Sequence, residues 1–480
     1  MLDAVKRSAR LFFSVPGLVI FGLALRTYHY ARNPSMWHDE AVLVLNVLHK
    51  DFVQLWGKLD FAEAAPPLFL CLERLVVLAL GDSTFALRLV PFLSSCGALL
   101  LFARIAPRIV NAAAVPWAVL LVAASDHLLW HTCEAKPYST DVFVAVFLLS
   151  MFVTTETWTP ARRALFFALV APGVIFISFP GVFLIGAVLA ALLPPALRQR
   201  WSARLAYVGL VVVVGVSFVM LLLGPVRAQR CPEMDSCWEG CFATLDRPLA
   251  LPGWACYNTA QICRYCCEPV GNVLTILAGI GAWSMARRRP ALLALLVVPC
   301  ALALAASFLH AYPYTAARVL VYTTPAWVLL IAEGTSVAFG ERRGVSPPWT
   351  SYRQLLVRIA GAIVVVLLLV APCYALFHVI APQPRTECGT AADFVLDRIQ
   401  HDEAVTSNAP ESRYYLRGSD AFVVPDEVAA VDVSRIWLIG TGRTESDRLA
   451  CLQTLPSGTW RCTRERDYTL TTIYRLERQP

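Results

Sequence analysis

Long apolar segments alternate with short polar ones along most of this chain. Eleven apolar runs approach the length of about 20 residues that a helix needs to cross a bilayer. They are 11–28, 84–105, 109–125, 139–156, 164–179, 180–197, 203–224, 270–286, 291–309, 318–338 and 355–379. The pattern predicts a polytopic α-helical membrane protein with about 11 transmembrane helices, the first of them an uncleaved span.

A twelfth run, 66–80, is short, follows a double proline and carries Glu73 and Arg74. If it lies in the membrane interface, every short basic turn falls on the cytoplasmic side, whereas most of those turns move outside if it spans. We therefore predict an interfacial helix at 66–80 and a cytoplasmic N-terminus. The basic turns are Lys6, Arg7 and Arg10; Arg104 and Arg108; Arg162 and Arg163; Arg198, Arg200 and Arg204; Arg287, Arg288 and Arg289; Arg342 and Arg343.

This topology places five stretches on the far side of the membrane: 29–83, 126–138, 225–269, 310–317 and the tail 381–480. Seven cysteines lie in the third of these stretches and three in the tail, which favours disulfides in an oxidising compartment. The alternative is a zinc site built on the closely spaced Cys263, Cys266 and Cys267. The cysteines are Cys231, Cys237, Cys241, Cys256, Cys263, Cys266 and Cys267, with Cys388, Cys451 and Cys462 in the tail.

Charge divides the chain into two parts. Only 16% of the 480 residues are charged, against about 25% in soluble proteins. Of the 41 basic and 34 acidic residues, 27 lie in the last hundred positions. We therefore expect a membrane body at 1–380 and a small soluble α/β domain at 381–480, with helices at 391–400 and 445–452 and strands at 403–407 and 435–440. This domain is expected to be structural or to contact an acceptor.

The first outer stretch contains an acidic pair, Asp39 and Glu40, directly after Trp37 and before an apolar helix. Ionisable groups at the membrane edge are costly and are default functional candidates. The alternative is helix capping, because an acidic residue before an apolar run satisfies free N–H groups and favours the helix dipole.

Two further outer stretches carry unusual charge. Residues 125–141 hold Asp126, His127, His131, Glu134, Lys136, Tyr138 and Asp141, and residues 310–318 end on Arg318. Three polar stretches on one side are expected to converge on one site. Carboxylates beside lysine and arginine suit the activation of a hydroxyl while an anion is held.

At these residues the chain resembles the bacterial C-type (GT-C) glycosyltransferases, and within them the branch of protein O-mannosyltransferases and lipid A aminoarabinose transferases. The resembling segments, in order, are MWHDEA (36–41), APPLFL (65–70), GDSTFALRL (81–89), EAKPYSTD (134–141) and YPYTAARVL (312–320). The resemblance implies a GT-C-like body with interfacial helices near 40–50 and 66–80. It also implies a bacterial inner-membrane enzyme that uses a polyprenyl-phosphate-linked sugar on the periplasmic face.

Roles for individual residues follow from the resemblance. Asp39 matches the general base or acceptor-orienting residue, and Glu40 matches its neighbour, which helps to position the acceptor. Lys136 stands where the family commonly has arginine, so it supplies a point charge to the donor phosphate without the bidentate fork. Arg318 is a second phosphate candidate, or else an interface anchor. Tyr138 is a possible hydrogen-bond donor to the phosphate.

Other residues are expected to line the site: Trp37, His38, His131 and Glu134. The last three could instead hold a divalent metal near Asp39, but their spacing is not diagnostic and no metal ligand is assigned. The expected partners are the lipid-linked donor, membrane lipid and a hydroxyl acceptor (protein, lipid or surface glycan), with no nucleic acid. The alternatives are a transporter or flippase and a non-catalytic binder of lipid-linked saccharides.

Overall fold

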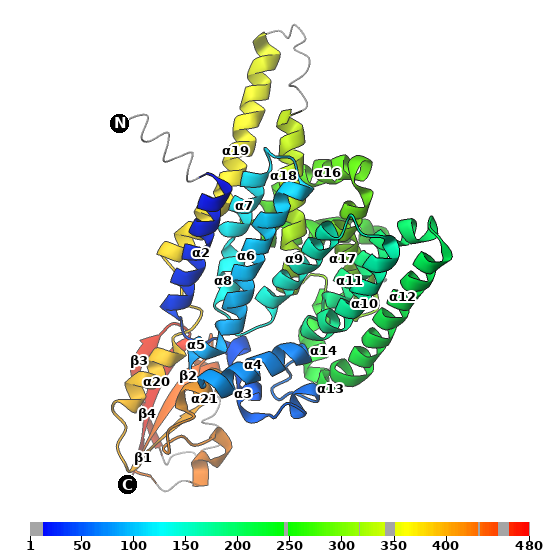
Figure 1. Ribbon diagram of the computed structural model, residues 1–480. Helices are drawn as coiled ribbons and strands as arrows, with labels where there is room; N and C mark the ends of the chain where they lie inside the picture. Colours follow the sequence, from blue (N-terminus) through cyan, green and yellow to red (C-terminus); the bar gives the residue numbers. More distant parts are fainter. Residues whose placement is uncertain are drawn as a thin grey trace.

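The structure is a computed structural model that describes residues 13–243, 248–315, 317–340, 351–430, 433–449 and 460–479. A bundle of long helices forms the body, and a small sheet with its own helices lies at one end of it (Figure 1). Three groups named above lie outside the described residues: the basic residues 6, 7 and 10, the basic residues 342 and 343, and the cysteine at 451.

Each of the eleven predicted runs overlaps a helix of the bundle. These helices are α2 (Val15–Arg32), α6 (Leu89–Ile109), α7 (Val115–Ala123), α9 (Tyr138–Thr154), α10 (Pro160–Ile177), α11 (Gly181–Leu197), α12 (Trp201–Leu221), α16 (Gly271–Arg288), α17 (Pro290–Phe308), α18 (Thr324–Gly340) and α19 (Ser351–Ile380). Among the described residues, five helices are long and apolar enough to cross a membrane, or six if one bent pair counts as a span. A multi-pass membrane protein is therefore confirmed, while the count of 11 stays a prediction.

Shorter elements join these helices. They are α3 (His38–His49), η1 (Gln54–Trp56), α4 (Pro67–Leu80), α5 (Thr84–Leu87), α8 (Asp126–Thr132), the π-turn η2 (Leu222–Val226), α13 (Arg227–Gln229), α14 (Pro232–Trp238), η3 (Glu239–Cys241), η4 (Pro248–Ala250), α15 (Leu251–Cys266) and η5 (Ala317–Thr323). Figure 1 shows α3, α4, α14 and the tail gathered at the same end of the bundle. The two helices expected near 40–50 and 66–80 are confirmed as α3 and α4.

Three of the turns predicted to be cytoplasmic meet one another. Arg289, between α16 and α17, pairs with Glu156 after α9 at 3.1 Å, and its guanidinium also donates to the carbonyl of Arg108 at the end of α6. The buried Glu333 of α18 pairs with Arg288 in the same region. The three turns therefore share one side of the bundle, as the topology requires.

Close backbone approaches hold α15, α16 and α18 together. α15 and α16 meet at an angle of 103°. A Cβ on Gly271 would collide with the carbonyl of Cys263, so glycine permits this corner. Gly281 and Gly334 face each other across α16 and α18, and a side chain on either would collide with the other helix's backbone. Small residues at a helix crossing are typical of membrane bundles.

A buried arginine completes the end of α7. Arg26 of α2 donates to the carbonyls of Val122 and Ala123 at 3.1 and 3.0 Å, and to the hydroxyl of Ser95 at 2.9 Å. The last carbonyls of a helix have no partner within it, so a cation at this position satisfies them and complements the helix dipole. Arg26 is thus a structural charge in the body.

The tail is an α/β unit, as the sequence predicts. Its sheet has the order β1-β2-β4-β3, with β1 parallel to β2 and the other pairs antiparallel. The strands are β1 (Glu403–Ser407), β2 (Arg435–Thr441), β3 (Trp460–Tyr468) and β4 (Thr471–Arg478), and the helical segments are α20 (Cys388–Leu396), α21 (Pro410–Leu416), η6 (Pro425–Ala430) and α22 (Glu445–Leu449). Apolar clusters on both faces of β1 and β2 form its core.

The tail docks on the first outer stretch. Tyr415 of α21 accepts a hydrogen bond from the backbone N–H of Met36 at 2.7 Å, and Tyr414 donates to the carbonyl of Asp82 at 2.9 Å. Arg417 pairs with the Asp82 carboxylate at 2.7 Å. These contacts place α21 beside the start of α3, which carries the acidic pair.

The disulfide prediction is wrong for the residues that the structure describes, because every cysteine there is free. The outer stretch that holds seven of these cysteines is largely helical in the part that the structure describes. Cys263 and Cys266 of α15 and the adjacent Cys267 are buried in the main core, where they act as small apolar side chains. Cys237 and Cys256 are exposed but unpaired.

Candidate active site

Glu40 is a buried structural carboxylate. It occupies the third position of α3, where it also accepts a hydrogen bond at 3.4 Å from the backbone N–H of Trp37, the N-cap residue. The guanidinium of Arg88 donates a hydrogen bond to each carboxylate oxygen of Glu40, at 2.9 and 2.7 Å. The backbone N–H of Ala135 donates a third hydrogen bond to this carboxylate at 2.8 Å. Arg88 is fully buried. Glu40 therefore joins three segments that are far apart in sequence.

Asp39, one position earlier on α3, faces a different partner. Its Oδ2 accepts a hydrogen bond from Nη1 of Arg318 at 2.6 Å. The side chains of Asp39 and Arg318 are 22% and 36% exposed, so this ion pair is open to a ligand. The guanidinium also lies 5.8 and 5.6 Å from the rings of Trp37 and Trp238. The structure thus brings the predicted base and a predicted phosphate ligand into contact.

Lys136 forms a second ion pair at the site. Its Nζ donates to Oε2 of Glu63 at 2.5 Å, and both side chains are largely buried. Phe61 and Ala62, just before Glu63, both have positive φ, a conformation that costs energy for residues with a side chain. No sequence motif marks Glu63, which lies between alanines in a short connecting segment.

Glu134 is the centre of a buried network. It accepts hydrogen bonds from His131 and from Nε1 of Trp37, the latter at 2.8 Å. Burial alone would raise the pKa of Glu134, but His131, Arg385 and Trp37 outweigh burial and lower it to about 2. Burial lowers the pKa of His131 despite the adjacent carboxylate. Glu134 is therefore an anion at neutral pH.

Arg385 covers this network from the segment that leads into the tail. Its guanidinium lies 4.3 Å from the ring of Trp37 and 4.3 Å from that of Trp130, and 3.5 Å from Glu134. Stacking between aromatic faces stabilises a guanidinium. No sequence motif marked Arg385, because its partners come from distant segments.

The remaining predicted residues lie at the edge of the site. Tyr138 begins α9, is buried and packs its ring 4.7 Å from that of His131. His38 turns toward the tail, where Glu411 lies 3.3 Å away. The hydrogen bond to Glu411 raises the pKa of His38. His38 therefore contacts the tail.

The metal alternative at these positions does not match the geometry. Among the described residues, the group with metal-like geometry is Asp126, His127 and Glu268, and it includes none of the residues proposed near Asp39. His131 and Glu134 form a hydrogen bond with each other.

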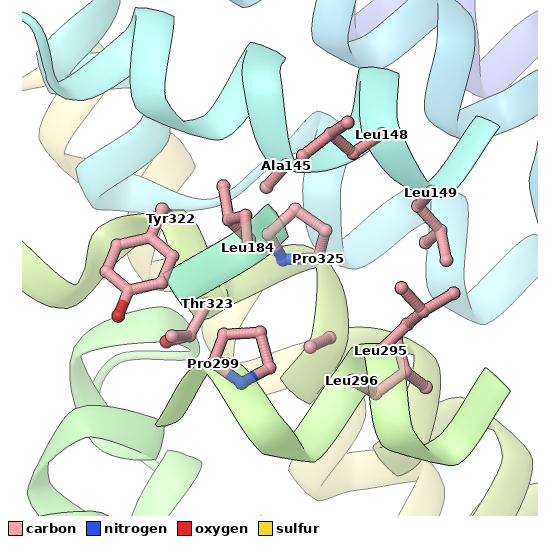
Figure 2. A pocket seen from close by; sticks show the side chains of 11 residues that line it. Ala145, Leu148, Leu149, Leu184, Leu295, Leu296, Pro299, Tyr322, Thr323 and Pro325 are labelled. Carbon is pink, nitrogen blue, oxygen red and sulfur yellow. The ribbon is translucent and has the colours of Figure 1, made fainter. Parts of the chain in front are cut away.

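An apolar cavity lies among α9, α11, α17 and α18 (Figure 2). η5 begins next to Arg318 and ends at Tyr322 and Thr323, the polar residues of the cavity wall. The other lining residues are apolar side chains of α9, α11, α17 and α18: Ala145, Leu148, Leu149, Leu184, Leu295, Leu296, Pro299, Pro325 and Ala326. One short helix therefore connects the charged site to an apolar interior.

No family model matches the sequence, and no curated protein matches it. Solved structures that share its fold include two of one protein. ArnT from Cupriavidus metallidurans bound to undecaprenyl phosphate has 14% sequence identity and a TM-score of 0.56, over 96% of this chain and 98% of that chain. The same protein in the apo state has 13% identity and a TM-score of 0.52 over the same shares.

These similarities extend over nearly the whole chain, sheet domain included. The protein therefore has a GT-C glycosyltransferase-like membrane fold, as the sequence resemblance predicts. More specifically, its arrangement of helices and tail is similar to that of ArnT.

Proposed function

We propose that this protein is a membrane glycosyltransferase that transfers a sugar from a polyprenyl-phosphate-linked donor to an acceptor hydroxyl. The observation that carries the proposal is the contact between Asp39 and Arg318, which are 279 positions apart in sequence and meet at a partly open site. A carboxylate beside an arginine can take a proton from a hydroxyl while a phosphate is held nearby. The similar fold of ArnT bound to undecaprenyl phosphate supports the donor class.

In the proposed reaction, the acceptor oxygen bonds to the anomeric carbon of the sugar as the bond from that carbon to the phosphate oxygen breaks. Asp39 orients the hydroxyl and accepts its proton. The leaving polyprenyl phosphate carries the electron pair and a negative charge, which Arg318 and Lys136 stabilise. Each of these cations now pairs with a carboxylate, so donor phosphate competes with Asp39 and Glu63 for them.

The apolar cavity at the end of the short helix that carries Arg318 has a volume of about 30 Å³, which is too small for a prenyl chain (Figure 2). The lipid part of the proposal is therefore supported by the fold shared with ArnT bound to undecaprenyl phosphate.

Glu40 has a different proposed role from Asp39. Both of its oxygens are taken by Arg88 and Ala135, so it positions α3 and with it Asp39. The wall of the site beside Asp39 is formed by Trp37, His131, Glu134 and Tyr138.

The proposed location is the bacterial inner membrane, with a cytoplasmic N-terminus and with the site and tail in the periplasm. Residues 1–380 form the membrane body and 381–480 the periplasmic domain. The positive charge of the turns supports this orientation, and the docking of the tail beside α3 puts it on the same side as Asp39. The acceptor hydroxyl belongs to a protein, a lipid or a surface glycan.

A release assay tests the proposal against transport and non-catalytic binding. Purified protein in detergent is incubated with a polyprenyl-phosphate sugar labelled in the sugar, together with cell-envelope acceptors. Free polyprenyl phosphate with a labelled acceptor, or with released sugar, is expected. The same protein is also reconstituted in sealed vesicles, where movement of label across the membrane without product indicates a transporter. Donor binding without turnover indicates a binding protein. Either result refutes the proposal.

A further inference from the structure

Three metal-ligating side chains converge outside the site described above. One ligand atom from each of Asp126, His127 and Glu268 lies within 4.8 Å of the others, and all three side chains are only partly exposed. They are not needed for the proposed transfer reaction. The proposed reaction therefore does not explain why these three side chains lie together.

The fold brings these residues together from distant segments. Asp126 and His127 begin α8, directly after the turn that follows α7. Glu268 lies at the sharp corner between α15 and α16. His378, near the end of α19, places its Nδ1 3.0 Å from Oδ1 of Asp126. Three parts of the bundle meet at this point.

The side chains are already oriented toward one another. Nε2 of His127 lies 2.6 Å from Oε2 of Glu268. The His127 ring stacks on Tyr265, with the ring centroids 3.6 Å apart and an angle of 6° between the planes. This stacking fixes the direction of the imidazole, and His378 does the same for the Asp126 carboxylate. Outer partners that orient ligands in this way are typical of metal sites.

The donor set also suits a cation. The group offers two carboxylates and one imidazole, and Arg264, which is about half exposed, pairs with Glu268 at 3.8 Å. Carboxylate oxygens and imidazole nitrogens bind Zn²⁺ at about 2.0–2.2 Å. Two ligands of one tetrahedral ion are then roughly 3.4 Å apart, so small side-chain movements bring this group into place.

We propose that Asp126, His127 and Glu268 bind a zinc ion, with His378 orienting Asp126 as an outer partner. Imidazole among the ligands favours a transition metal over Mg²⁺ or Ca²⁺. The ion links the corner between α15 and α16 to α8. Through the contact of His378 with Asp126, it is also linked to the end of α19. Since α19 leads into the tail, the ion stabilises the end of the helix from which the tail extends.

Metal titration of the full-length protein tests this proposal. The protein, purified in detergent and stripped with a chelator, is titrated with Zn²⁺, and bound metal is measured after gel filtration. We expect a single zinc ion per chain and a higher thermal unfolding midpoint with zinc. Asp126→Asn and Glu268→Gln are expected to weaken binding at least about tenfold, whereas His401→Gln, an exposed histidine of the tail, leaves it unchanged.

Cobalt spectroscopy of the unaltered protein provides a second test that does not depend on the variants folding. Co²⁺ in the site is expected to show the d–d bands of nitrogen and oxygen ligands without a thiolate charge-transfer band. A thiolate band would assign the metal to the cysteines of α15, whose Cys266 carbonyl lies 3.3 Å from the Ser125 hydroxyl. That band, unchanged affinity in both variants, or a preference for Mg²⁺ or Ca²⁺ overturns the proposal.

Discussion

The separate roles of Asp39 and Glu40 can be tested through the buried ion pair of Glu40. In the variant Glu40→Ala, Arg88 loses two charge-assisted hydrogen bonds and the Ala135 N–H loses its acceptor. Breaking a buried pair by removing one partner costs about 3–5 kcal/mol, because the other charge stays buried. Arg88 keeps Asn33 and the Pro34 carbonyl at 2.9 and 2.6 Å, so we expect the lower end, about 3 kcal/mol.

Thermal unfolding in detergent, followed by intrinsic fluorescence, measures this effect. A change of 1 kcal/mol shifts Tm by about 2–4 °C in chains of 150–250 residues, and by less in longer ones, so we expect a fall of roughly 5 °C. The double variant Glu40→Leu/Arg88→Met removes both charges and is expected to recover part of the loss. A Tm within about 1 °C of the unaltered protein for Glu40→Ala would refute the structural role of Glu40.

Three further predictions concern neighbouring contacts. Because the pKa of Glu134 is lowered, its ionised carboxylate contributes fully to stability above its ordinary pKa of 4.5, and this contribution is lost as the pH falls toward about 2. The variant Glu134→Gln should therefore flatten the acid limb of a curve of Tm against pH. An unchanged acid limb contradicts this prediction. Lys136→Ala should raise the KM for donor at least about tenfold, since a charge-assisted contact contributes about 1.5–3 kcal/mol; Lys136→Arg should retain most donor affinity, and equal KM values for both variants contradict a phosphate role. Tyr415→Phe removes the acceptor of the Met36 N–H, which costs about 1 kcal/mol of docking free energy. Proteolytic cleavage between body and tail should therefore become faster, and an unchanged cleavage rate refutes the docking role of Tyr415.

The helical body was predictable because the bilayer imposes a strong pattern on sequence. Apolar runs have the length of a span, and every predicted run overlaps a helix. Helix lengths were less predictable: α7 has only 9 residues, and Arg26 of another helix satisfies its last carbonyls. Tertiary partners of that kind leave no local signal.

The tail shows where the local pattern fails. The strand at Glu403–Ser407 is buried on both faces, and its boundaries were predicted correctly. β3 was missed because it is an exposed edge strand, rich in arginine, with few apolar positions. α21 was missed as well, since its seven residues are mostly polar. Its tyrosines are explained by docking against the body rather than by the helix itself.

At the site, candidate residues were named from the sequence, but their pairing was not predicted. Asp39, Lys136 and Arg318 were candidates whose roles stay predictions, and the structure pairs Asp39 with Arg318. Glu63 and Arg385 were missed, because each acquires meaning only through a partner far away in sequence. Ion pairs of this kind depend on the packing of the whole bundle.

The most direct test of the central claim compares two aspartates of the same outer stretch. Asp39→Asn keeps the size of the side chain but removes the base, and turnover of labelled polyprenyl-phosphate sugar should fall about 10²–10⁴-fold. Asp60→Asn is the matched control, because this exposed carboxylate pairs with Lys50 at 3.1 Å, away from Arg318, and its turnover should stay near that of the unaltered protein. If Asp39→Asn inserts normally and retains full transferase activity, Asp39 is not the base and the proposed mechanism is wrong.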